Sequence, residues 1–263
     1  MTTLIKLGGS LITDKHKARA FRQEATRIIA SQIRKVWKAE PGLRLVIGHG
    51  SGSFGHFAAE IHETAAGVDS AKQWLGFSEV AEAALALSHL VLLELLEQGL
   101  PVMRFQPSSF IEATDGQIVA MQTSLIAQAL ESDIIPLLHG DVALDSQIGG
   151  TIISTERIFA HLAKSLPVKR IILLGEVDGV LDADGGVIPS VTPSTFDSIR
   201  SVMGGSSGID VTGGMLQKVE EMVALVVEDP SLEVIIANGR RPNVLTDLLS
   251  QNQRTGTRIT LRP

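Results

Sequence analysis

The sequence contains no cysteine, and only 4% of its 263 residues are aromatic. Without cysteine there is no disulfide framework, which is usual for proteins of a reducing compartment. The first residues lack a basic segment followed by an apolar one, so we expect no signal peptide and a cytoplasmic location. Because 44% of the residues are apolar, the core must consist mainly of aliphatic side chains.

Long hydrophobic runs and basic runs are also missing. The longest apolar stretch, residues 83–96, is interrupted by Ser88, His89 and Glu94, and is too short and too polar for a membrane span. The formal net charge is −6, and no run of lysine and arginine stands out. We therefore expect neither a membrane nor nucleic acid as partner. A small phosphate ligand needs only local positive charge, so the negative net charge does not argue against it.

Two common catalytic motifs are absent. No glycine run is followed by Gly-Lys-Ser/Thr, so there is no Walker A loop, and no G-x-S-x-G elbow is present. Gly50, Gly52 and Gly55 match the spacing of the dinucleotide fingerprint. However, the acidic residue expected about 20 residues later would be Asp69, and its surroundings do not suggest a strand. A dinucleotide site is therefore disfavoured.

The most informative stretch is the glycine-rich loop 48–55, which follows the apolar run 43–47. Glycines let backbone N–H groups approach a ligand, and a following helix adds partial positive charge, so this pattern favours an anion such as phosphate. His56 ends the loop and can donate a hydrogen bond to that anion. The alternative is a structural glycine turn with a surface histidine. His139, beside Gly140-Asp141, is the second choice for this role. His49, His62 and His89 do not stand, as His56 does, at the end of the glycine loop.

Apolar runs that suit strands alternate with stretches of helical periodicity along most of the chain. This alternation predicts an α/β fold, a three-layer αβα sandwich with a mainly parallel central sheet. Ligands then bind at the carboxyl ends of the strands, where the glycine motifs lie. The expected strands are 3–7, 43–47, 102–105, 134–138, 169–174, 233–237 and 257–261, with hairpins at 111–120, around 149–150 and at 184–186. The expected helices are 21–39, 71–98, 123–130, one starting near 154–155, 194–203, one starting near 210–215, and 244–249.

Five motifs are Lys6-Leu7-Gly8-Gly9-Ser10, the loop 49–56, Gln106-Pro107-Ser108-Ser109-Phe110, His139-Gly140-Asp141 and Asp210-Val211-Thr212-Gly213-Gly214-Met215. In this order they resemble the isopentenyl phosphate kinase family of the amino acid kinase superfamily. The resemblance implies transfer of the γ-phosphate of ATP, with Mg²⁺, to isopentenyl phosphate, which yields isopentenyl diphosphate for isoprenoid biosynthesis. It further implies a homodimer and a single domain over residues 1–263, with an acceptor-binding lobe at 1–166 and a nucleotide-binding lobe at 167–263.

The resemblance also assigns roles to individual residues. The implied catalytic residues are Lys6, Lys15, His56 and Lys218. The implied ATP-binding residues are Lys6, Gly8, Gly9, Ser10, Gly52, Glu176, Asp178, Gly214 and Lys218. The implied acceptor-binding residues are Gly50, Ser51, Gly55, His56 and Thr155, and no side chain is expected to be a dedicated metal ligand. We also expect some of Phe77, Val80, Ala83 and Ala84, in the helix 71–98, to line a short prenyl pocket, although core or dimer packing would explain them too.

The sequence departs from the family pattern at three places. Gly50-Ser51-Gly52 replaces Gly-Gly-Gly, Ser154-Thr155-Glu156-Arg157 replaces Ser-Gly-Asp-Asp, and Glu176-Val177-Asp178-Gly179 replaces Asp-Val-Asp-Gly. Glu156 retains one acid that could orient the lysines, whereas Arg157 reverses the next charge. The alternatives are a kinase for another small oxyanion, such as fosfomycin or, less favoured, UMP or an amino-acid carboxylate, and a non-catalytic nucleotide or oxyanion binder, because a fold does not fix a function.

Overall fold

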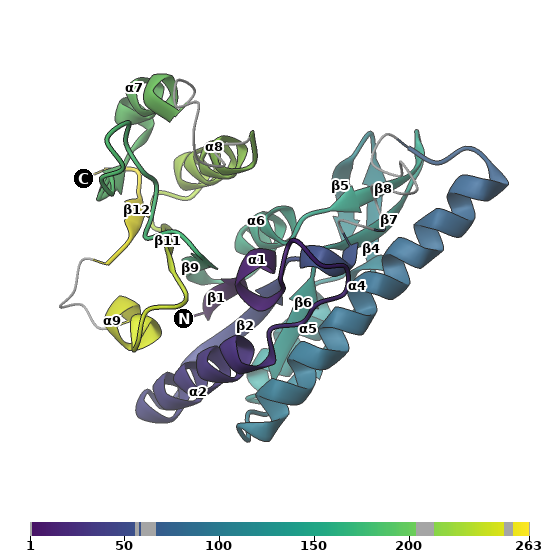
Figure 1. Ribbon diagram of the computed structural model, residues 1–263, viewed down its shortest axis with the longest axis horizontal. Coiled ribbons are helices and arrows are strands. Elements are labelled where there is room, and N and C mark those ends of the chain that lie inside the picture. The colour runs from purple at the N-terminus through teal and green to yellow at the C-terminus, as the bar shows by residue number, and fades with distance from the viewer. Residues whose placement is uncertain (1, 56–57, 59–66, 204–212, 250–254, 263) are drawn as a thin grey trace.

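The computed structural model describes residues 2–55, 58, 67–203, 213–249 and 255–262 (Figure 1). An eight-stranded sheet forms the centre of this part of the chain, and all neighbouring strands in it are parallel except one antiparallel pair, β11 with β12. In spatial order its strands are β10 (Ser190–Val191), β12 (Thr257–Ile259), β11 (Glu233–Asn238), β9 (Val168–Gly175), β1 (Thr2–Leu7), β2 (Arg44–His49), β6 (Ile135–His139) and β3 (Val102–Arg104). The predicted, mainly parallel sheet is confirmed.

Helices cover both faces of this sheet. On one face they are α1 (Gly9–Ile12), α2 (Gln23–Ala39), α4 (Ala71–Glu97) and α9 (Val244–Leu249), and on the other α5 (Ser124–Glu131), α6 (Thr155–Ser165), α7 (Pro193–Met203) and α8 (Gly213–Glu228). Successive strand residues enter opposite cores: Leu4 packs in the core with α6 and α8, and Ile5 in the core with α2 and α4. Burial on both faces explains why these strands read as continuous apolar runs.

A second, four-stranded sheet lies beside the amino-terminal part of α4 (Figure 1). Its order is β5 (Gln117–Met121), β4 (Ile111–Thr114), β7 (Asp141–Asp145) and β8 (Gly149–Ile153). The two hairpins that compose it were predicted, but the parallel pairing of β4 with β7, which joins them, was not. A short 3₁₀ helix, η2 (Pro107–Ser109), precedes β4.

The longest described helix, α4, was predicted to within one residue. Ser70 caps it, and the side chains of Ser70 and Gln73 form a reciprocal capping box. Its middle and carboxyl-terminal turns pack on the sheet, whereas Phe77 and Val80 belong to a separate small cluster. Among the described helices, none has the combination of length and hydropathy that a bilayer span requires.

Two local expectations need correction. No helix was expected between the strand 3–7 and the helix 21–39, but Gly9-Ser10 opens the short helix α1, with Gly8 at its N-cap. Strand β2 continues two residues beyond the expected end at Ile47 and takes in Gly48 and His49. Both differences have the same cause, because glycine is disfavoured inside helices and strands and therefore predicts a loop, whereas at these positions the surrounding structure sets the backbone conformation. The proposed division into lobes 1–166 and 167–263 stays a prediction, and the central sheet runs through both.

Candidate active site

The carboxyl ends of β1, β2 and β9 lie side by side and carry the first glycine motifs. β1 pairs with β2 so that Leu7 faces His49, and with β9 so that Leu7 faces Leu174. The N–H of Gly8 donates to the carbonyl of Leu174 at 2.7 Å, and the N–H of Gly50 donates to that of Leu7 at 3.0 Å. These bonds fix both glycine motifs at one edge of the sheet, as predicted.

The two glycine segments are in direct backbone contact. A Cβ atom placed on Gly9 would lie 2.6 Å from the Cα of Gly52, so no side chain is tolerated at this contact. Gly52 itself has φ +49°, in the left-handed region that glycine adopts without strain. The segment that follows β1 and the segment that follows β2 therefore meet at van der Waals distance, with their amides on one small surface.

Thr13 ties these two segments together. Its fully buried hydroxyl donates to the carbonyl of Gly9 at 2.7 Å and accepts the N–H of Ser53 at 2.9 Å. The sequence interpretation missed this residue. The available signal was its position four residues after Gly9, because threonine often hydrogen-bonds the carbonyl of residue i−4.

Three charged side chains meet next to the glycine segments. Lys6, the last residue but one of β1, forms an ion pair with Glu156, in the first turn of α6. Lys218 of α8 places its Nζ 3.6 Å from the same Glu156 oxygen. The Cε of Lys6 lies 3.9 Å from the position that a Cβ on Gly50 would occupy, which puts the lysine beside the glycine-rich loop. The residues suspected of orienting one another are thus brought together.

The electrostatics of this cluster keep Glu156 ionised. Burial alone would raise the pKa of Glu156, but the charges of Lys6 and Lys218 outweigh burial and lower it to about 2. Burial lowers the pKa of Lys6, and Lys218 adds to this, while the carboxylate of Glu156 acts in the opposite direction. One carboxylate between two ammonium groups leaves a net positive charge, which is the condition for attracting an anion.

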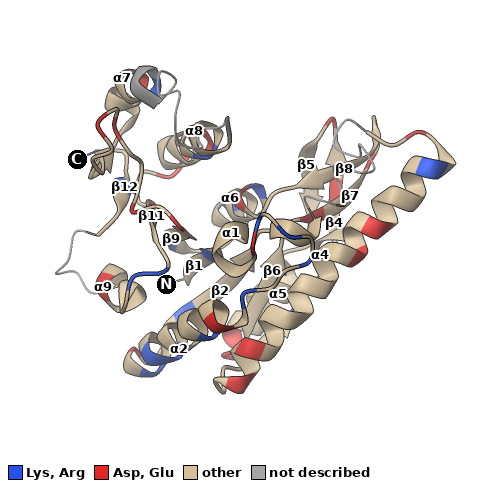
Figure 2. Cartoon of the chain, in the orientation of Figure 1, with Lys and Arg blue, Asp and Glu red and all other residues tan. Residues whose placement is uncertain are grey.

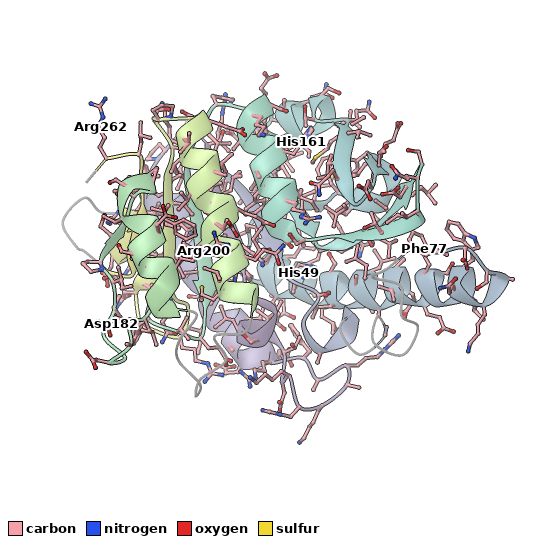
Figure 3. All side chains as sticks on the ribbon, turned by 90° about the horizontal axis from the view of Figure 1, so that it is seen from above. His49, Phe77, His161, Asp182, Arg200 and Arg262 are labelled. Carbon is pink, nitrogen blue, oxygen red and sulfur yellow. The ribbon has the colours of Figure 1, made fainter. Side chains whose placement is uncertain are left out.

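A stacked pair of buried histidines lies beneath the glycine-rich loop. His49, labelled in Figure 3, lies opposite His139 on the neighbouring strands β2 and β6. The two rings are 5.5 Å apart and nearly parallel at 11°. Burial, with the neighbouring charge of His139, lowers the pKa of His49 to about 3, and burial with Arg104 lowers that of His139 to about 4. Both rings are therefore neutral near pH 7. Nδ1 of His49 contacts the carbonyl of Gly50 at 3.0 Å.

Thr155 also lies at this edge, as the first residue of α6. Its hydroxyl donates to the carbonyl of His49 at 2.6 Å, and its methyl group packs against Gly48, where a Cβ would be 2.6 Å away. The hydroxyl predicted to touch the acceptor is thus already engaged with the strand that carries the loop. Ser51 precedes Gly52 in the loop, and its carbonyl accepts the N–H groups of Phe54 and Gly55.

Arginines hold the acidic residues that follow β9. Arg22 donates to the carboxylate of Glu176 at 2.6 Å and to the carbonyl of Ser10 at 3.0 Å, so it links the first glycine motif to the segment after β9. Arg240 pairs with the same carboxylate of Glu176. Asp178 accepts a hydrogen bond from Asn238 at 3.2 Å. The sequence interpretation did not find Arg22, whose partner is 154 residues away.

The sequence also predicted Lys15, Gly214 and His56 for the site. Lys15 is exposed in the segment between α1 and α2, where lysine and arginine gather (Figure 2). Gly214 is exposed in the first turn of α8. His56 lies outside the described residues. Within the part of the chain that the structure describes, no three His, Asp or Glu side chains are arranged to hold a metal ion.

This arrangement suits binding two anionic groups side by side. Two glycine segments are in backbone contact, and Lys6 and Lys218 supply positive charge next to them. Nothing in it is a nucleophile with an adjacent base, because the buried histidines contact neither a serine nor a threonine hydroxyl. Positioning and charge stabilisation are therefore the chemistry that these residues offer.

Comparison with known proteins agrees with this geometry. The family model described as "Amino acid kinase family" matches residues 1–238. The isopentenyl phosphate kinase of Methanothermobacter thermautotrophicus is 34% identical over 98% of both chains, and that of Methanocaldococcus jannaschii is 30% identical over 92% of this chain and 93% of its own. A solved structure described as an isopentenyl phosphate kinase superposes with a TM-score of 0.83 at 29% identity, covering 99% of this chain and 100% of the other.

Proposed function

Because the chain belongs to the amino acid kinase family, we propose that it transfers the γ-phosphate of ATP to isopentenyl phosphate and yields isopentenyl diphosphate. Its similarity to enzymes named isopentenyl phosphate kinase over nearly its full length supports this choice of acceptor. The structural observation that carries the proposal is the backbone contact of two glycine segments beside the Lys6–Glu156–Lys218 cluster. Donor and acceptor phosphates would lie on either side of that contact.

Phosphoryl transfer asks for positioning and charge neutralisation more than for covalent chemistry. The nucleotide would enter as its Mg²⁺ complex, with the metal held mainly by its phosphates, as is usual for Mg²⁺ at kinase sites. In this assignment the amides of Gly9 and Ser10 bind the donor phosphates, and Gly8, whose N–H donates to the carbonyl of Leu174, fixes the start of their segment. Gly52 stands between donor and acceptor, at the point where the two segments touch.

The acceptor is already ionised, so it needs no strong general base. Its approach to ATP is instead opposed by charge repulsion, about 4 kcal/mol for two unit charges 4 Å apart at an effective dielectric of 20. Lys6, Lys218 and Mg²⁺ would offset this repulsion. Glu156, ionised and in contact with both lysines, would keep their ammonium groups directed at the transferred group.

The acceptor phosphate would bind to the loop of β2. The amide of Ser51 and the side chain of His56 would hold it, while Gly50, whose N–H donates to the carbonyl of Leu7, fixes the start of the loop. Thr155 would support the loop through its bond to the carbonyl of His49. The prenyl tail would extend toward the small apolar cluster of Val68, Phe77, Val80 and Val142. Ala83, by contrast, packs in the main core on the sheet, so its predicted place in the pocket is less favoured.

The same family membership leads us to propose a cytoplasmic homodimer. Leu93 and Leu96, 42% and 45% exposed on α4, are apolar residues that a second copy could cover. The nucleotide-binding role of residues 167–263 and the acceptor-binding role of residues 1–166 belong to the same proposal. Glu176 and Asp178 would lie on the nucleotide side, with Gly214 and Lys218 of α8.

One incubation series tests the function. The protein is mixed with ATP, Mg²⁺ and, separately, isopentenyl phosphate, fosfomycin, UMP or glutamate, and transfer of labelled phosphate is followed with product identification by mass. We expect isopentenyl diphosphate as the main product and little phosphate transfer to the other acceptors. Preferential phosphorylation of fosfomycin would replace the proposed acceptor, and ATP binding without any transfer would favour a non-catalytic binder.

A further inference from the structure

Arg157, at a position where the sequence departs from its family's usual acidic residue, contacts two different parts of the molecule. Its backbone N–H donates to the capping hydroxyl of Ser154 at 3.2 Å, which fixes the residue in the first turn of α6. Its Nη1 donates to the carbonyl of Gly116 at 2.8 Å, in the turn between β4 and β5. Its Nε lies 3.5 Å from the carboxylate of Glu221 on α8.

The turn that Arg157 grips is itself rigidly held. The carboxylate of Asp145, at the end of β7, accepts the N–H groups of Asp115 at 3.0 Å and of Gly116 at 2.8 Å. It also accepts those of Gln147 and Ile148. These bonds hold the carbonyl of Gly116 in place. The guanidinium group of Arg157, bound to this carbonyl, is thereby held in position to contact Glu221.

Consecutive residues of α6 thus match residues one turn apart on α8. Glu156 contacts Lys218, and Arg157 contacts Glu221, three residues further along the same helix. The two pairs have opposite polarity, so sliding or rotating α8 by one turn would bring like charges together. This pattern fixes one register of α8 against α6 near the glycine segments.

Arg157 also removes a competitor for Lys218. Residues at i and i+3 of a helix are neighbours, so Glu221 is within reach of Lys218 on their shared helix surface. Glu221 is instead engaged by Arg157 and by Gln217, whose Nε2 donates at 3.2 Å. Because Glu221 is engaged, the ammonium group of Lys218 pairs with Glu156 and stays beside Lys6.

We propose that Arg157 is a positioning residue, which acts through Glu221 to set the place of Lys218 and couples the β4–β5 hairpin to α8. It touches no reacting atom in this assignment. The inference rests on the proposed phosphoryl transfer, because it concerns the site of Lys218, and it explains the reversed charge at this position. The longer acid Glu156 bridges the two lysines while the arginine beside it holds the helix that carries one of them.

The test is a double-mutant cycle measured as kcat with saturating ATP and acceptor. We expect Arg157→Ala to lower kcat about tenfold and Arg157→Glu, which also places a like charge beside Glu221, about a hundredfold. Each factor of ten corresponds to about 1.4 kcal/mol of transition-state stabilisation. Adding Glu221→Arg to Arg157→Glu should recover part of the loss, although the bond to Gly116 stays broken. When Lys218 is already replaced by Met, adding Arg157→Ala should lower kcat by less than about twofold further. The two effects are not additive because both changes remove the same contribution of Lys218.

Arg200→Ala is the matched control. Arg200 pairs with Glu220 of α8 at 3.4 Å and ties α8 to α7 instead of α6, so we expect this variant to keep parental kcat. Melting temperatures of all variants are recorded. If Arg157→Glu does not fold, Arg157→Gln is measured instead, because the amide of glutamine can still donate to the carbonyl of Gly116.

Three outcomes would overturn the inference: parental kcat in Arg157→Ala, an equal loss in Arg200→Ala, or an undiminished effect of Arg157→Ala in the Lys218→Met background. If the parent protein prefers another acceptor, the proposed function is wrong, but the same ratios measured with that acceptor still test Arg157.

Discussion

At the scale of single residues, the site depends on a carboxylate that two lysines share. Lys6 was detectable in the sequence as a charge inside an apolar strand, and Lys218 only through the family resemblance. Their meeting point, Glu156, is buried at 6% exposure, and its charge is compensated only while a lysine remains beside it. Lys6 is the closer of the two partners, so removing it should destabilise the fold as well as slow the reaction, whereas removing Lys218 leaves the closer pair intact.

Lys218→Met should consequently separate catalysis from stability. We expect kcat to fall about 10²–10³-fold, the range found when a charge-stabilising donor is lost, with a change of only a few degrees in melting temperature. Lys164→Met, an exposed lysine of α6 paired with Glu228 at 2.6 Å, is the control. If Lys218→Met binds ATP and turns over like the parent, this lysine is not part of the site.

His56 is the residue on which the acceptor assignment depends most. A histidine at the end of a glycine-rich loop can donate to the acceptor phosphate, and that bond should tighten as charge shifts in the transition state. We expect His56→Ala to lower kcat about 10²–10⁴-fold, as for a positioned acid–base group, with little change in ATP affinity. His89→Ala, at an exposed position of α4, serves as control. A folded His56→Ala variant within a few-fold of parental kcat would contradict the assignment.

At the scale of elements, the ends of β2 and β6 bring together two neutral histidines. Their pKa values, about 3 for His49 and about 4 for His139, lie below the ordinary value of 6.5. Between those values the unfolded chain binds more protons than the folded one, so the free energy of unfolding must fall as pH is lowered from about 6.5. Each group contributes at most about 1.4 kcal/mol per pH unit.

This linkage predicts how the protein unfolds in acid. Urea unfolding between pH 7 and pH 4.5 should show stability decreasing with falling pH, and His139→Phe should make that decrease shallower. Below about pH 4.5, protonation of Glu156 adds a further loss, because its pKa of about 2 is depressed from 4.5 and its stabilisation fades as pH falls. Identical slopes for His139→Phe and the parent would show that His139 is protonated in the folded state.

The sequence was a good guide to elements and a poor guide to their distant partners. α4 and seven of the eight strands of the central sheet were predictable because their apolar residues extend over several positions, whereas the two-residue strand β10 was not predicted. α1 was not, because four residues carry no period. The pairing of Glu112 in β4 with Leu144 in β7 joins hairpins whose local patterns say nothing about each other. The same holds for the site: the glycine motifs were visible, whereas the contacts of Arg22 with Glu176 and of Thr13 with Ser53 join residues that are distant in the sequence.

At the scale of the whole molecule, the described residues pack into three apolar clusters. Two of them form the cores on the faces of the central sheet. The third is small and lies between α4 and β7, where Val68, Phe77, Val80 and Val142 meet. Phe77 packs edge-on against Trp74 at 5.3 Å and closes on Gly150, where a Cβ would lie 2.6 Å from its ring. A cluster separate from the main cores can change shape for a ligand at less cost to the fold.

That separation yields a prediction about substrate choice. If the third cluster receives the prenyl tail, each methylene buried there contributes about 0.8 kcal/mol. Isopentenyl phosphate should then exceed methyl phosphate in kcat/KM by about two orders of magnitude or more, because 1.4 kcal/mol is a factor of ten. Phe77→Ala should reduce this ratio at least about tenfold and leave the KM for ATP unchanged. The exposed Leu93→Ala on the same helix should change neither. Measured kcat/KM values for both acceptors decide the matter: equal ratios in the parent and Phe77→Ala would assign this cluster to packing alone.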